Sequence, residues 1–173
     1  SNPVGGLLDS PTYIQNIIDG FTAAKNNADS RNKHWESQRQ YWVSEYQKFV
    51  ARKQWNQADT ALQQRDLAIQ RRDIFADFLT RFNNVINTLT NLKLVSQANE
   101  SYINNGVKFS QFDAYKANLQ NASRIYSIEL VNLYQGIVEK INNQKEKGLI
   151  DVQENITKYI ENKEVFIYRE NAK

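Results

Sequence analysis

The chain has 173 residues, 40% of them hydrophobic and 24% charged, so its length and composition fit one domain with a continuous apolar core. Its 22 Lys and Arg against 19 Asp and Glu leave a net charge of +3 on a mixed surface, which argues against nucleic-acid binding. The sequence contains no Cys, which excludes disulfides and thiol catalysis. No apolar run reaches the roughly 20 residues that a membrane span requires.

The distribution of glycine and proline predicts the fold class. No proline follows Pro11, and residues 21–105 contain no glycine. These two residue types are the strongest breaks in regular structure, and the long stretch without them carries apolar residues at helical spacing. We therefore predict an all-α fold: an elongated bundle of about three long antiparallel helices plus a short N-terminal helix. Residues 1–9 should form a flexible N-terminal arm, and residues 10–170 a single helical-bundle domain.

The short N-terminal helix is predicted to begin at Pro11. Ser10 and Pro11 have the form of an N-cap followed by a proline at the first helical position. We expect Gly20 to interrupt this helix and residues 26–30 to form a turn. The apolar face of the helix consists of Tyr13, Ile14, Ile17, Ile18 and Phe21.

A long helix with a narrow aromatic seam is predicted from Arg31 onward. Trp35, Trp42 and Phe49 recur every seven residues, as in a coiled coil. Six residues separate Phe49 from Trp55, so the stripe changes phase, and we expect a break near residues 54–60. That break could be a kink, a short loop or a face presented to a partner. The polar segment 52–73 keeps a seven-residue spacing at Trp55, Leu62 and Ile69.

Two further long stripes predict the core of the bundle. The first runs from Phe75 to Leu92 and is followed by a predicted loop over residues 97–109. Ser110 with Asp113 resembles a capping box that opens the next helix, and Gly148 is a natural stop for it. Asp151 with Glu154 would then begin a final helix. We expect the following stripe residues to be buried: Phe78, Phe82, Leu119 and Tyr126.

Residues able to carry chemistry are sparse. The only histidine, His34, is expected to be an exposed or interface imidazole, because no second histidine or cysteine could complete a metal site with it. No Gly-rich phosphate loop, nucleophile elbow or dinucleotide-binding pattern occurs. We therefore expect no catalytic residue, no cofactor and no metal, and no enzymatic activity.

The basic and aromatic residues of the polar segment allow two interpretations. Five cations between residues 52 and 72 could form a surface for nucleic acid or an acidic partner. However, Asp59, Asp66 and Asp73 lie among them, so intrahelical ion pairs are the better account. The tryptophans at 35, 42 and 55 could stack on a base or a sugar, but their seven-residue spacing favours packing in a core.

The segment from Val4 to Asn16 resembles the mature start of the minor pilins, the pilus-tip subunits of type IV secretion and conjugation systems. That family often begins with a short apolar stretch ending in Asp, followed six and seven residues later by Gln-Asn; Asp9, Gln15 and Asn16 keep this spacing. A Gly-Leu-x-Asp-x-x-Glu turn at residues 148–154 is also similar. The Pro that usually precedes the Asp is absent here, and the polar segment 52–73 has no counterpart.

The resemblance implies a non-enzymatic structural or adhesive component of a secretion or conjugation pilus. It implies a periplasmic, cell-surface or secreted location after removal of a signal peptide, and protein partners among the other pilus subunits. The alternative is a helical adaptor or scaffold that docks partner helices through an exposed groove.

The N-terminal segment is the predicted site of partner binding. Two leucines follow a glycine pair, and nothing local fixes them. We hypothesise that residues 3–16 dock into another subunit and that the bundle folds without them. The partner-binding residues expected from this hypothesis are Leu7, Leu8, Asp9, Tyr13 and Gln15.

Overall fold

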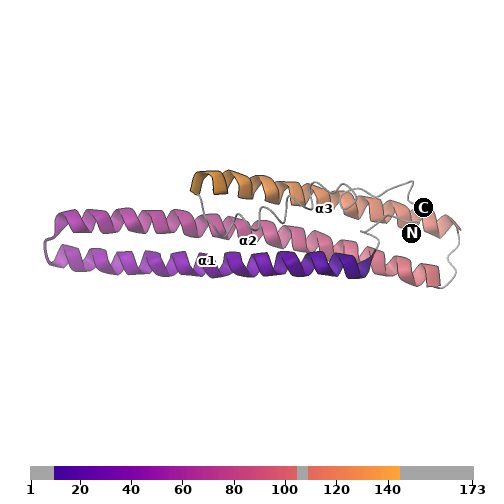
Figure 1. The fold of residues 1–173 in the computed structure, drawn as a ribbon, viewed down its shortest axis with the longest axis horizontal. Helices are drawn as coiled ribbons and strands as arrows, with labels where there is room; N and C mark the ends of the chain where they lie inside the picture. The colour runs from indigo at the N-terminus through magenta and orange to yellow at the C-terminus, as the bar shows by residue number, and fades with distance from the viewer. Residues whose placement is uncertain (1–9, 105–108, 145–173) are drawn as a thin grey trace. The chain divides into compact units, whose positions relative to one another are not determined.

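The computed structural model describes residues 10–104 and 109–144, and within them the chain forms three α-helices and no strand (Figure 1). The helices are α1 (Pro11–Ala51), α2 (Trp55–Asn104) and α3 (Phe109–Gln144). The predicted all-α fold of long helices is confirmed. Gly148 and the final helix expected after it lie outside the described residues.

The chain divides into two compact units, each with its own packing. Lys25–Thr80 form one, which we call the hairpin, because it consists of the later part of α1, a tight turn and the first part of α2. The chain up to Ala24 and from Arg81 on forms the other, which we call the three-helix unit. Its described residues come from the beginning of α1, the later part of α2 and α3.

Helix α1 begins where the sequence predicts and continues further. The Tyr13 amide donates to the Ser10 hydroxyl at 3.3 Å, and the Ile14 amide donates to the Ser10 carbonyl at 3.0 Å, so Ser10 caps the helix. The expected break at Gly20 and turn at residues 26–30 are wrong, because α1 continues through both to Ala51. Phe21 and Ala28 are buried seven residues apart, and this continuous buried face outweighs the modest helical cost of one exposed glycine.

The connection between α1 and α2 is shorter and earlier than expected, at residues 52–54. The Gln54 amide donates to the Phe49 carbonyl at 2.9 Å, and the Lys53 amide donates to the Val50 carbonyl at 3.0 Å. Lys53 has a φ of 58°. These bonds and this left-handed residue form a Schellman motif, in which glycine is the usual occupant of the position that Lys53 holds. Of the three expected forms of the break, the short loop is the one observed.

The core of the three-helix unit follows the predicted stripes. Phe82, Leu119 and Tyr126 are fully buried there, and Phe78 is fully buried in the hairpin, so all four core predictions are confirmed. The Phe21 ring packs against Phe82, with 6.5 Å between the ring centroids. Ile14 and Ile17 are also buried, so the beginning of α1 contributes to this core, and docking of residues 3–16 into another subunit stays a prediction. Residues 3–9 lie outside the described residues.

Helix α3 runs back along the later part of α2 (Figure 1). The Arg81 guanidinium donates to the Asn132 carbonyl at 3.0 Å. It lies over Gly136, where an added Cβ would come within 2.7 Å of the Arg81 Cζ atom. The expected loop at residues 97–109 is shorter than predicted, because α2 continues to Asn104 and Ser110 lies inside α3 instead of capping it. None of the helices over 10–104 and 109–144 is both long and apolar enough to cross a membrane.

Candidate functional site

In the hairpin, α1 contributes large aromatic side chains to the contact and the start of α2 contributes small ones. The buried residues at the start of α2 are alanines, at positions 58, 61 and 68. They take the place of the expected stripe, since Trp55 is 59% exposed and Leu62 and Ile69 are only partly buried. Helix α1 supplies Trp35, Trp42 and Phe49, and all three are half-buried. Two helices alone cannot enclose such a seam, so its aromatic side chains remain partly open.

A polar network joins the two helices midway along the hairpin. The Glu36 carboxylate accepts bonds from the Arg39 Nε atom at 2.6 Å and, across the hairpin, from the Arg72 guanidinium at 3.0 Å. The hydrogen bond from Arg39, followed by the one from Arg72, lowers the pKa of Glu36 to about 2. The Asn32 side-chain amide also donates to the Arg72 carbonyl at 2.9 Å. This network fixes the register of α1 against α2.

Two arginines of the hairpin lie against aromatic rings of the opposite helix. The Arg71 guanidinium sits 4.6 Å from the centroid of the Trp35 ring, and that of Arg31 sits 5.3 Å from the Phe75 ring. Such cation–π contacts stabilise by about 0.5–1 kcal/mol at exposed sites. The predicted pairing of the basic residues with neighbouring acids is found at Arg65 and Arg72, each bonded to the Asp that follows it.

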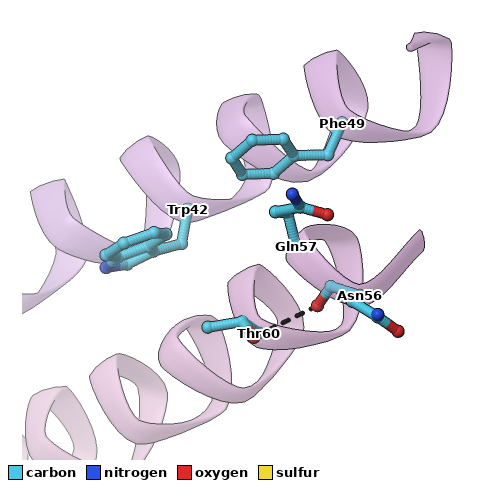
Figure 2. A pocket seen from close by; sticks show the side chains of 5 residues that line it. All are labelled: Trp42, Phe49, Asn56, Gln57 and Thr60. Carbon is cyan, nitrogen blue, oxygen red and sulfur yellow. Dashed lines mark hydrogen bonds between the residues drawn. The ribbon is translucent and has the colours of Figure 1, made fainter. Parts of the chain in front are cut away.

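An open hollow lies near the turn of the hairpin, within the described residues of that unit. Its volume is about 250 Å³, and it is lined by Trp42, Phe49, Asn56, Gln57 and Thr60. Figure 2 shows the Trp42 and Phe49 rings extending from α1 toward α2, where Gln57 and Thr60 lie. The Thr60 hydroxyl donates to the Asn56 carbonyl at 3.1 Å, so its methyl group is what it offers to the hollow.

The lining suits an apolar side chain. No residue that lines the hollow is a carboxylate, a cation, a histidine or a thiol. Its volume is below the roughly 300–1,000 Å³ of pockets that take drug-sized ligands. Two aromatic walls with a few amide groups at the edge are instead typical of a site that receives one large apolar side chain.

The other candidate residues are already engaged or lie elsewhere. Leu7, Leu8 and Asp9 lie outside the described residues. Gln15 accepts a bond from Lys93 at 2.6 Å and donates to Asp19 at 2.8 Å, so both ends of its amide are used inside the three-helix unit. The Tyr13 side chain is half-buried at the beginning of α1.

His34 and the acidic residues form no metal centre in the described part of the chain. The His34 side chain is exposed, as expected, and its ring stands edge-on to Trp35 at 4.9 Å. No group of three or more metal-ligating side chains comes together among residues 10–98 and 113–140.

On α3, the three-helix unit exposes three large apolar side chains. Ile125, Ile128 and Val131 are 42%, 54% and 37% exposed, and they point away from the buried stripe of that helix. Single exposed apolar residues are common on proteins, and only contiguous patches indicate contacts.

Comparisons with protein families, with curated proteins and with solved structures give no match for this chain.

Proposed function

We propose that this chain is a non-enzymatic protein that works by binding other protein chains, as a structural or adhesive subunit of a type IV secretion or conjugation pilus. The hollow of the hairpin supports the binding role, because its two aromatic walls remain open to an apolar side chain from outside. The resemblance of residues 4–16 to minor pilins supports the assignment to a pilus. A secreted or cell-surface location belongs to the same proposal.

A genetic experiment tests both parts of this proposal. The gene would be deleted in its native host, and pili would be counted by electron microscopy while DNA transfer to a recipient is measured. The wild-type gene should restore both. The double variant Trp42→Ala/Phe49→Ala should leave both near the level of the deletion, because it removes the two walls of the hollow.

A matched control separates loss of the hollow from loss of apolar surface in general. Leu94→Ala/Ile128→Ala also removes two large exposed apolar side chains, but both lie in the three-helix unit. This variant should restore pili and transfer fully. If deletion of the gene leaves pili and transfer unchanged, the pilus assignment is wrong.

The hollow also supports the second candidate, a helical adaptor that docks partner helices. Under that proposal the double variant Trp42→Ala/Phe49→Ala loses a protein partner, while pilus number and DNA transfer stay at the wild-type level. The same set of strains therefore distinguishes the two functions.

A further inference from the structure

We propose that the occupant of the hollow is an acidic protein segment that inserts one large apolar side chain between Trp42 and Phe49. The inference rests on the proposed protein-binding function and adds the chemistry of the partner. It is carried by the charges of the hairpin and of the turn next to the hollow.

The hairpin carries the entire net charge of the chain. Residues 25–80 contain ten of the 22 Lys and Arg and seven of the 19 Asp and Glu, which leaves +3 on this unit and none on the remainder. Most of its acids already have a cation beside them. Glu45 pairs with Lys48 at 3.2 Å, Asp29 with Lys33 at 2.9 Å and Asp66 with Arg65 at 2.8 Å.

The two cations at the turn are not matched in this way, and neither is Lys25 elsewhere in the hairpin. Arg52 and Lys53 are exposed, and within the described chain neither is paired with a carboxylate. They belong to the turn that joins Phe49 to Asn56, and both of those residues line the hollow. An approaching acidic segment therefore meets positive charge at the mouth of an apolar site.

Lys53 strengthens this argument through its backbone. It occupies the left-handed position of the turn, with a φ of 58°, where glycine would sit without steric cost. Backbone strain of this kind is concentrated at functional positions. A lysine here places a cation at the turn in spite of the strain.

Peptide binding to the full chain tests the proposal. The probe is a synthetic helical peptide with glutamates on its polar face and one central Phe, labelled for fluorescence anisotropy. Its twins carry Lys in place of each Glu, or Ala in place of the Phe. We expect the acidic Phe peptide to bind at least about tenfold more tightly than either twin, and added salt to weaken it.

Two variants separate the charge inference from the proposed function. Arg52→Glu/Lys53→Glu should weaken the acidic Phe peptide at least about tenfold. Lys33→Glu/Arg65→Glu changes the net charge equally but removes cations that have acidic partners elsewhere on the hairpin, and it should bind within about twofold of wild type. Phe49→Ala should abolish binding. Circular dichroism of each variant verifies that the helices are retained.

The possible results distinguish the charge inference from docking in the hollow. If the Lys twin binds as tightly as the acidic peptide, or if Arg52→Glu/Lys53→Glu binds normally while Phe49→Ala does not, the charge inference is wrong and the docking function stands. If no peptide binds, or if Phe49→Ala binds like wild type, docking in the hollow is wrong as well.

Discussion

The strained residue at the turn of the hairpin gives a direct test of the fold at the scale of one side chain. Lys53 adopts a left-handed backbone conformation. The backbone amides of Lys53 and Gln54 donate to the carbonyls of Val50 and Phe49 and complete the Schellman motif. Lys53→Gly should therefore stabilise the protein by about 0.5–1 kcal/mol, because glycine has no Cβ to clash there. Urea unfolding followed by circular dichroism measures the change. A loss of stability would contradict the assigned turn geometry.

The buried phenylalanine at the junction of α1 and α2 in the three-helix unit gives a second test. Phe82 is fully buried and packs against Phe21. Phe82→Ala should cost about 3–5 kcal/mol, since it removes transfer free energy and leaves a cavity. The exposed Leu94 is the control, and its replacement by Ala should stay within about 0.5 kcal/mol of wild type. A cost under about 1 kcal/mol for Phe82→Ala would place that side chain outside the core.

At the scale of the elements, the Glu36 network predicts how the hairpin responds to acid. The bonds from Arg39 and Arg72 lower the pKa of this carboxyl from 4.5 to about 2. Its contribution to stability is therefore fully present above pH 4.5 and is lost as the pH falls toward 2. Glu36→Gln should show a smaller loss of stability across this window than wild type in urea titrations. Equal pH profiles would mean that the network does not form in solution.

The sequence predicted the kind of elements better than their ends. Ser10 and Pro11 identified the start of α1 because a cap is a local signal. The break expected at Gly20 was wrong, because buried contacts at Phe21 and Ala28 are tertiary and outweigh a local preference. The alanine seam of α2 was also missed, since alanine gives no strong periodic signal in a polar segment.

The candidate site could be predicted only in part. The seven-residue spacing of Trp35, Trp42 and Phe49 was visible in the sequence, and it correctly placed these rings on one seam. Their openness was not visible, because it depends on how little bulk Gln57 and Thr60 offer from α2. The register of α1 against α2 decides which side chains of the two helices meet. That register is set by the turn at residues 52–54, which contains no glycine to mark it in the sequence.

At the scale of the whole molecule, the two units should differ in local stability. The fully buried large side chains of the three-helix unit include Phe82, Leu89 and Tyr126, whereas much of the hairpin seam is alanine. Because opening free energies follow buried apolar contacts, hairpin amides over residues 28–68 should exchange with solvent faster than core amides of α2 and α3. Hydrogen exchange by mass spectrometry at increasing urea measures this order. If the amides of both units exchange only when the whole chain unfolds, the two units unfold as a single cooperative unit and this prediction is wrong.

The aromatic residues of the hairpin have a spectroscopic consequence. All three tryptophans of the sequence, at positions 35, 42 and 55, lie in the hairpin, and no tryptophan lies in the three-helix unit. Emission excited at a wavelength selective for indole therefore comes from the hairpin alone, whereas helical ellipticity comes from both units. An unlabelled chain thus provides two optical signals with different origins. A denaturation curve followed by emission should have an earlier midpoint than one followed by ellipticity wherever the hairpin opens first.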